Sequence, residues 1–67
     1  MTLVFLNGQP KEVSIGISLT QAIAAWEYTQ SDFAVAVNQQ FVPRSDHHKT
    51  VLNEGDQIEI IAPIQGG

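Results

Sequence analysis

Residues 18–26 read SLTQAIAAW, and this stretch predicts the helix around which the rest of the fold is arranged. Ser18 followed three residues later by Gln21 has the form of a capping box, in which the two side chains satisfy backbone donors at a helix start. Four apolar residues then recur at the i, i+3, i+4 and i+7 spacing of one helix face: Leu19, Ala22, Ile23 and Trp26. We expect a helix from Leu19 to about Tyr28, with its apolar stripe covered by a sheet.

Two strands joined by a tight turn are predicted ahead of this helix. Residues 2–6, TLVFL, are β-branched, apolar and aromatic. Asn7-Gly8 follows, the dipeptide that best tolerates the positive φ angles of a two-residue hairpin turn. A second strand is expected over residues 11–15, because Val13 and Ile15 alternate with polar residues.

Three further strands are predicted after the helix. Residues 33–37, FAVAV, form a near-continuous apolar run typical of a strand covered on both faces, and we place it in the middle of the sheet. Residues 38–40 make a turn, and Phe41-Val42 restarts a short strand that Pro43 confines to an edge. Residues 57–62, QIEIIA, form the last strand.

The order strand, strand, helix, strand, short strand, strand predicts a β-grasp (ubiquitin-like) fold, an α+β domain in which a mixed sheet of four to five strands packs on one helix. We expect residues 1–65 to form this domain and residues 66–67 a flexible tail. The predicted core comprises Leu3, Phe5, Val13, Ile15, Leu19, Ile23, Trp26, Val35, Val37, Leu52, Ile58 and Ile60. Alternation leaves for the uncovered sheet face Val4, Leu6, Ile61 and Ile64. There they would form a partner surface or be scattered exposed aliphatics.

Composition limits the classes of function. The 67 residues carry a net charge of −4, and the three basic residues are too few for a phosphate-backbone ligand, so no nucleic acid is expected. The early apolar run, residues 3–6, is too short for a signal peptide or a membrane span. The sequence has no cysteine, which fits a reducing compartment. We expect a cytoplasmic protein that binds no membrane and is a monomer when free.

The terminal pair Gly66-Gly67 is the most informative feature for function. Residues without side chains can pass through a narrow channel, and glycine adopts whatever φ and ψ the channel imposes. A flexible end also lets a carboxylate reach the active site of another protein. The alternative is a frayed terminus, where glycine is harmless.

Other candidate residues favour structural roles. His47-His48, with Asp46 beside them, could suggest a metal, but adjacent residues on a polar connection with no spaced third ligand are more typical of solvated side chains. Ser18 fits its helix-cap role better than a catalytic triad. Trp26 fits the core better than a cofactor platform, and Arg44 is either a loop charge or an ion-pair partner for another protein. The acidic residues show no acid–base spacing and are expected on a solubilising surface: Glu12, Glu27, Asp32, Glu54, Asp56 and Glu59.

Four segments of the sequence carry a family resemblance. They are AVAVN at residues 34–38, VPR at 42–44, LNEGDQIEI at 52–60 and QGG at 65–67. Together they resemble the ThiS family, the sulfur carriers of thiamin thiazole synthesis. The resemblance extends over the whole chain in length and element order, and it is most specific from Ala34 to Gly67.

This resemblance implies a β-grasp carrier that has no catalytic residue or bound cofactor of its own. The Gly67 carboxylate would be adenylated by a ThiF-type enzyme that uses ATP and magnesium. Sulfur from a donor enzyme would then replace AMP, and the thiocarboxylate would pass its sulfur to a ThiG-type thiazole synthase. An acyl adenylate makes chemical sense here, because a carboxylate is a poor electrophile until it is given a good leaving group. Only Gly66 and Gly67 carry over as functional residues.

Two alternatives stay open. The MoaD family of molybdopterin sulfur carriers also ends in Gly-Gly, but its members are usually longer and typically carry Pro-Pro before the tail, where this chain has the single Pro63. The other alternative is a β-grasp interaction module or protein modifier that binds partners without carrying sulfur. A passive module should tolerate residues added after Gly67, whereas a carrier should not.

Overall fold

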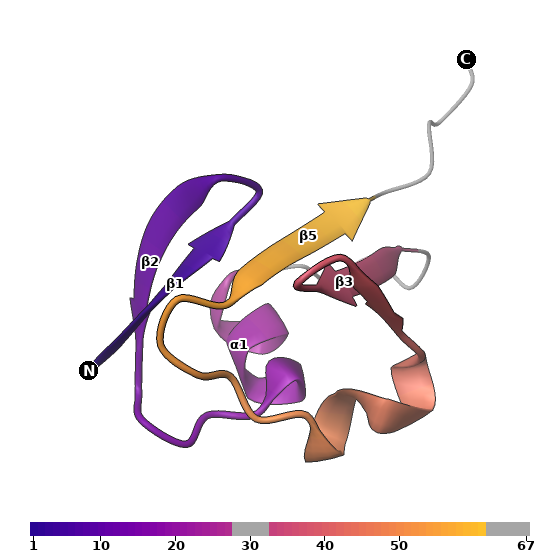
Figure 1. Cartoon of the computed structure of the whole chain (residues 1–67). Coiled ribbons are helices and arrows are strands. Elements are labelled where there is room, and N and C mark those ends of the chain that lie inside the picture. Colours follow the sequence, from indigo (N-terminus) through magenta and orange to yellow (C-terminus); the bar gives the residue numbers. More distant parts are fainter. Residues whose placement is uncertain (28–32, 62–67) are drawn as a thin grey trace.

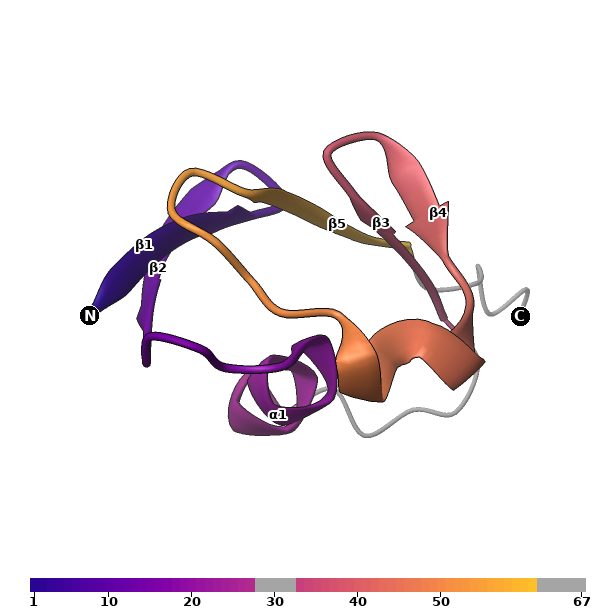
Figure 2. The same ribbon diagram turned by 60° about the horizontal axis from the view of Figure 1, so that its bottom comes forward.

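The computed structural model describes residues 1–27 and 33–61 of the chain. In order, the elements are β1 (Thr2–Leu6), β2 (Gln9–Val13), helix α1 (Leu19–Ala25), β3 (Ala34–Val37), β4 (Gln40–Val42), the 3₁₀ helix η1 (Arg44–Lys49) and β5 (Gln57–Ile61). The strands form one five-stranded sheet in the order β2-β1-β5-β3-β4 (Figure 1). β1 and β5 are parallel, and the other neighbours are antiparallel. α1 and η1 lie on the same side of the sheet (Figure 2), which confirms the predicted β-grasp fold.

The first hairpin turns at Asn7-Gly8, as predicted. Both residues have positive φ angles, 50° and 84°, as a tight turn between right-handed twisted strands requires. The two-residue turn fixes the register of the hairpin, so that Thr2 pairs with Val13. Because cross-strand partners share a face of the sheet, the buried Val13 places Thr2 on the face that packs on the helix.

Because Thr2 points toward the helix, every second residue of β1 after it does so too. Val4 is 0% exposed and Leu6 is also buried. The prediction that Leu3 and Phe5 belong to the core was wrong, because both lie on the opposite face, where they are half-buried. The prediction that Val4 and Leu6 lie on the uncovered face was wrong for the same reason. β1 is apolar on both faces, so its own sequence contains no alternation that would reveal its orientation.

β2 ends at Val13, two residues before the predicted end. The Ile17 amide donates to the Ser14 carbonyl oxygen at 3.2 Å, and Gly16 between them has a φ of 83°. The chain therefore turns where the alternation pattern predicts another strand residue. Ile15, which we expected in the core, is 79% exposed.

The helix begins as predicted. The Gln21 amide donates to Ser18 Oγ, and the Ser18 amide donates to Gln21 Oε1, both at 3.1 Å, which completes the capping box. α1 is a little shorter than expected, with Trp26 as its C-terminal cap residue, and Tyr28 lies outside the described residues. The buried residues of the helix are Leu19, Ala22 and Ile23. Trp26 is half-buried and packs against the core from its edge.

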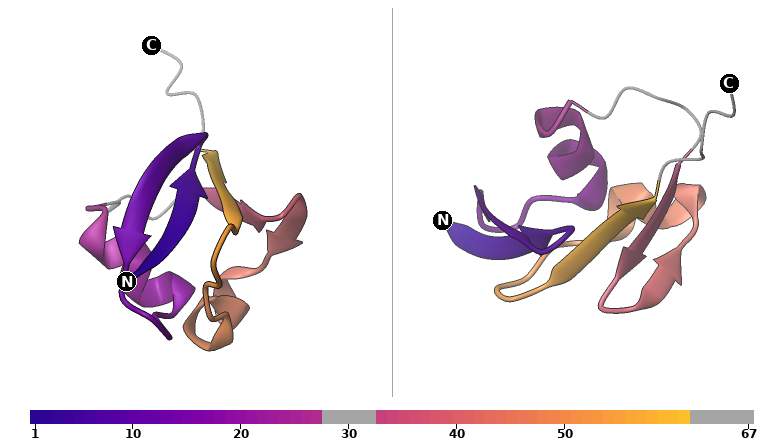
Figure 3. Two further views of the ribbon diagram at one scale, coloured as in Figure 1. Left: turned by 60° about the vertical axis from the view of Figure 1, so that its left-hand side comes forward. Right: turned by 90° about the horizontal axis from the view of Figure 1, so that it is seen from above.

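The core lies between the sheet and α1. Its buried apolar residues are Val4, Leu6, Val13, Leu19, Ala22, Ile23, Val35, Leu52, Ile58 and Ile60. β3 is an interior strand, as predicted, but the central position belongs to β5, which has β1 on one side and β3 on the other (Figure 3). β4 is an edge strand followed by Pro43, also as predicted. Within the described residues neither helix is long and apolar enough to cross a membrane.

The connection between β4 and β5 contains η1, which the sequence analysis missed. η1 packs beside α1, and its residue His47 is only 7% exposed. His47 Nε2 lies 3.1 Å from the carbonyl oxygen of Val42. A carbonyl oxygen can only accept, so Nε2 carries the proton in this hydrogen bond. The prediction that His47 is a solvated loop residue was therefore wrong, whereas its neighbour His48 is exposed.

Candidate functional site at the end of the last strand

The predicted functional residues Gly66 and Gly67 lie outside the described residues, as do Ile64 and the tail whose flexibility we predicted. The structure therefore locates the candidate site by the strand that leads to it. β5 ends at Ile61, and six residues of sequence, 62–67, follow it. The geometry around Ile61 determines where those six residues start and in which direction the strand points.

The end of β5 is held on both of its edges. On one edge β3 pairs with β5 as far as Ala34 and Ile61. On the other edge β1 pairs only as far as Leu6 and Ile58, because the hairpin turns away at Asn7. Asn7 itself continues the contact: its amide donates to the Ile58 carbonyl oxygen at 2.8 Å, and its Oδ1 accepts from the Ile60 amide at 3.0 Å.

The start of β5 is held by a second asparagine at the opposite hairpin. The Asn38 amide donates to the Gln57 carbonyl oxygen at 2.8 Å, and Asn38 Oδ1 accepts from the Gln57 amide at 3.0 Å. Asn38 Nδ2 also donates to Asp56 Oδ1 at 3.0 Å, while Asp56 Oδ2 accepts from the Asn53 amide at 2.8 Å. Sequence reasoning treated both asparagines as turn residues only.

The sheet face opposite the helix carries two exposed large apolar side chains near the end of β5, together with the exposed Glu59, which pairs with Ala36 on the same face. Phe41 is 68% exposed and pairs with Ala36, and Ile61 is 63% exposed and pairs with Ala34. We call these four residues the outer patch. Partners in neighbouring strands share a face, so the four side chains lie on one surface. Of the residues that we expected on this face, Ile61 is confirmed there.

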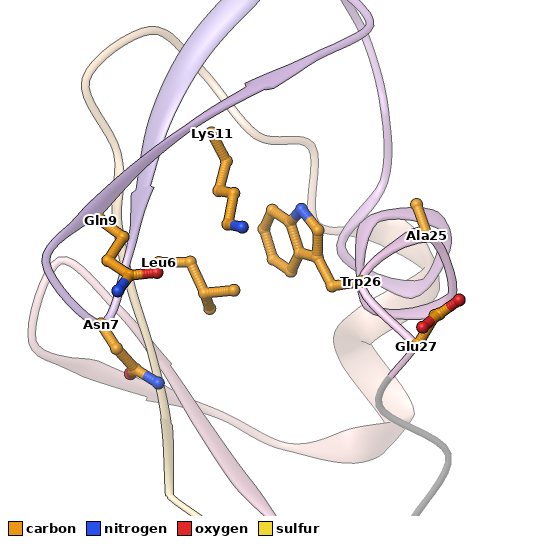
Figure 4. Close-up of a pocket in the computed structure, with 7 residues that line it drawn as sticks. All are labelled: Leu6, Asn7, Gln9, Lys11, Ala25, Trp26 and Glu27. Carbon is orange, nitrogen blue, oxygen red and sulfur yellow. The ribbon is translucent and has the colours of Figure 1, made fainter.

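A hollow of about 660 Å³ lies on the helix side of the β1–β2 hairpin, beyond the end of α1. Its lining residues are Leu6, Asn7, Gln9, Lys11, Ala25, Trp26 and Glu27 (Figure 4). Figure 4 shows the Lys11 side chain pointing toward the indole ring of Trp26. The hollow exposes one edge of Trp26, which explains why this residue is less buried than a core position would be.

Three of the remaining candidate residues, Ser18, Arg44 and Glu54, have structural partners, and Asp32 lies outside the described residues. Ser18 caps the helix, as predicted. The Arg44 guanidinium carbon lies 5.8 Å from the centroid of the Phe33 ring, a cation–π arrangement that sequence reasoning did not foresee. Glu54 Oε1 accepts from the Leu3 amide at 2.9 Å, so Glu54 joins the β5 loop to β1 instead of serving only as surface charge. Among residues 1–27 and 33–61, no group of three or more His, Asp or Glu side chains could hold a metal ion.

A five-stranded mixed sheet on one helix defines a ubiquitin-like β-grasp domain, and in the sequence its last strand is followed by Gly66 and Gly67. The crystal structure of a thiamine biosynthesis protein (ThiS) from Geobacter metallireducens has this fold. It matches with a TM-score of 0.85 at 23% identity, over 98% of this chain and 100% of that one. The ThiS family model matches residues 4–67, and the chain belongs to the ThiS family.

Two relatives refine this placement. The chain is 30% identical over 64 residues to the sulfur carrier protein ThiS of Escherichia coli (strain K12), a match that covers 96% of this chain and 97% of that protein. It is also 33% identical over 64 residues to a thiazole synthase of Magnetococcus marinus. That match covers 96% of this chain but only 20% of the longer protein, so a thiazole synthase contains a segment similar to most of this chain.

Proposed function

We propose that this chain is the sulfur carrier of thiamin thiazole formation and that its working group is the carboxylate of Gly67. The observation that carries the proposal is the ThiS family match, which runs over residues 4–67 and therefore includes both glycines. The relative from Escherichia coli is named as a sulfur carrier and is matched over nearly its full length. The chain acts as a cosubstrate, and its reactions are catalysed by its partners.

The proposed chemistry has two steps on the chain. In the active site of a ThiF-type enzyme that holds ATP and magnesium, a Gly67 carboxylate oxygen attacks the α-phosphate of ATP, and pyrophosphate leaves. Hydrosulfide delivered by a donor enzyme then attacks the acyl carbon, AMP leaves with the bonding electrons of the carbon–oxygen bond, and the sulfur loses its proton to water. The product is a thiocarboxylate at Gly67. Glycine suits this position because a channel that shields the adenylate from water leaves little room for side chains.

The thiocarboxylate then gives its sulfur to a thiazole synthase. This assignment is supported by the thiazole synthase of Magnetococcus marinus, which contains a segment similar to 96% of this chain. A carrier and its acceptor enzyme that occur in one polypeptide act at high effective concentration. The outer patch is the surface on which we expect partners to dock, because exposed apolar side chains lie there beside the last described residue of β5.

The test is a one-residue extension. A single alanine added after Gly67 moves the carboxylate by up to about 3.6 Å, more than the alignment with the α-phosphate tolerates. We expect the extended chain to fold normally but to form no AMP with the adenylating enzyme of the same organism. The matched control is a single alanine added before Met1, which should be adenylated at the native rate. Gly67→Ala should be slowed less severely, because it adds one methyl group but keeps the chain length.

Mass spectrometry of the reacted chain provides the second readout, since replacing one carboxylate oxygen by sulfur gives a defined mass increase. Circular dichroism confirms that each variant is folded. If the chain extended after Gly67 is adenylated as fast as the native chain, the carrier proposal fails. The interaction-module alternative then takes its place, because such a module does not use its terminal carboxylate.

A further inference from the structure

Asn7 follows the last residue of β1 and makes the hydrogen bonds to β5 that a further strand residue would make. In a parallel ladder, one residue donates its amide to one carbonyl of the neighbouring strand and accepts from the amide two residues further on. Asn7 makes both bonds, to the Ile58 oxygen and from the Ile60 amide, but the acceptor is its side-chain Oδ1. Its main chain, with a φ of 50°, already turns into the hairpin. The side chain thus extends the β1–β5 ladder beyond the end of β1.

Among the described residues, this is the last hydrogen bond between β5 and the β1–β2 hairpin. The ladder between β1 and β5 stops at Leu6 and Ile58, whereas β3 continues to Ile61 on the other edge. Ile60 is 7% exposed, so its amide has little access to water that could replace the asparagine. Without Oδ1, the last residues of β5 would be paired with β3 alone and free to tilt about that edge.

The direction of β5 at Ile61 matters because six residues follow before the reacting carboxylate. If a partner's active site draws these six residues out straight, they span about 20 Å, and a tilt of about 10° at Ile61 would then displace their far end by about 3.5 Å. That displacement equals the whole separation of about 3–3.5 Å between reacting atoms in a near-attack geometry. We propose that Asn7 is a positioning residue for the carboxyl end of this chain, acting through the Ile60 amide. The proposal rests on the carrier function above.

Asn38 offers a matched control within the same strand. It too occupies the first position of a two-residue hairpin turn, with a φ of 52°, and its Oδ1 accepts one amide of β5. That amide belongs to Gln57, at the opposite end of the strand from Ile61. Asn38 also bonds Asp56, so its removal costs at least as many hydrogen bonds as removal of Asn7. An effect that comes only from lost stability should therefore appear whichever of the two asparagines is replaced.

The variants are Asn7→Gly, Asn38→Gly and Asn7→Asp. Glycine adopts positive φ without strain, so each glycine variant removes the acceptor without disturbing the turn. Aspartate keeps an acceptor oxygen at the same position and also tolerates this conformation. The measurements are KM and kcat for adenylation of each folded chain by the adenylating enzyme, together with amide hydrogen exchange of each free chain by NMR.

Asn7→Gly should raise KM for the chain about fivefold, the result expected if the share of molecules with a productively directed end falls to about one fifth. The kcat should stay within about twofold of the native value, because a variant chain that has bound with its carboxylate in place reacts as the native chain does. Asn38→Gly and Asn7→Asp should both keep KM within about twofold of native. In the free chains, exchange at Ile60 should rise about tenfold in Asn7→Gly, and exchange at Gln57 should rise in Asn38→Gly.

An Asn7→Gly chain with native KM, or an Asn38→Gly chain whose KM rises equally, would overturn the positioning role. A native chain that is not adenylated would overturn the carrier function. In that event the exchange data still decide the local claim: unchanged protection at Ile60 in Asn7→Gly would show that Asn7 does not hold the end of β5.

Discussion

The two faces of the sheet differ sharply, although their residues alternate along the same strands. On β5, Ile58 and Ile60 are 1% and 7% exposed and belong to the core, whereas Ile61, the next residue, is 63% exposed. On β1, Val4 is buried and its neighbours Leu3 and Phe5 are only half-buried. Apolar residues thus occur on both faces. The difference teaches that register, and not hydrophobicity, decides which apolar residues stabilise the fold and which remain available to a partner.

The largest expected effect compares two adjacent residues of β1 on opposite faces. Val4→Asn should lower the free energy of unfolding by about 3 kcal/mol or more, because it removes a buried apolar side chain and leaves a buried amide without partners. Leu3→Asn should cost about 1 kcal/mol, because Leu3 is only half-buried on the outer face and water can reach the new amide. Urea denaturation of both variants measures the difference. Equal losses would contradict the assignment of faces.

Trp26→Ala should have an intermediate effect, since Trp26 borders the inner face where the hollow leaves it half-open. Truncating a fully buried tryptophan typically costs about 3–5 kcal/mol, so we expect about 2 kcal/mol here. Thermal unfolding followed by circular dichroism measures the loss. Leu19→Ala is the fully buried comparison on the same helix and should cost at least as much despite its smaller side chain. A loss above about 4 kcal/mol for Trp26→Ala would show that the hollow closes in solution.

Features that depend on a few neighbouring residues could be predicted from the sequence. The capping box needs only Ser18 and Gln21, and the first turn needs only Asn7-Gly8, so both are confirmed. The inward face of β1 was predicted wrongly even though the sequence contained what was needed. A two-residue turn at Asn7-Gly8 pairs Thr2 with Val13, and a buried Val13 then places Val4 inward. The prediction relied on alternation along single strands, whereas the pairing register of the hairpin determines which face of β1 is buried.

Features that depend on distant segments could not be predicted. The burial of His47 requires the carbonyl of Val42 and the packing of η1 beside α1, and neither contact leaves a periodic pattern in the sequence. The role of Asn7 at the candidate site requires that β5 extend beyond β1, a contact between residues 53 apart. The two glycines, in contrast, were a sequence signal from the beginning, and they stay a prediction because they lie outside the described residues.

The smallest expected effect on stability belongs to the outer patch. Phe41→Ser should change the free energy of unfolding by less than about 0.5 kcal/mol, because the Phe41 side chain is already 68% exposed on an edge strand. If partners dock on this patch, the same variant should weaken binding to the adenylating enzyme about tenfold, the usual effect of truncating an aromatic anchor. Ile15→Ser is the matched control. Ile15 is also apolar and is 79% exposed, but it lies in the turn after β2 and outside the patch.

Titration calorimetry of the three proteins, native, Phe41→Ser and Ile15→Ser, separates the possibilities. Loss of affinity for Phe41→Ser alone assigns the outer face to partner recognition and completes the contrast with the inner face, whose residues act through stability. Equal affinity for all three proteins would mean that exposed apolar residues on this sheet are merely tolerated, since water can reach them without cost to a core that lies on the other side. The contrast between the faces would then be one of burial only, and recognition would have to reside in the sequence beyond Ile61.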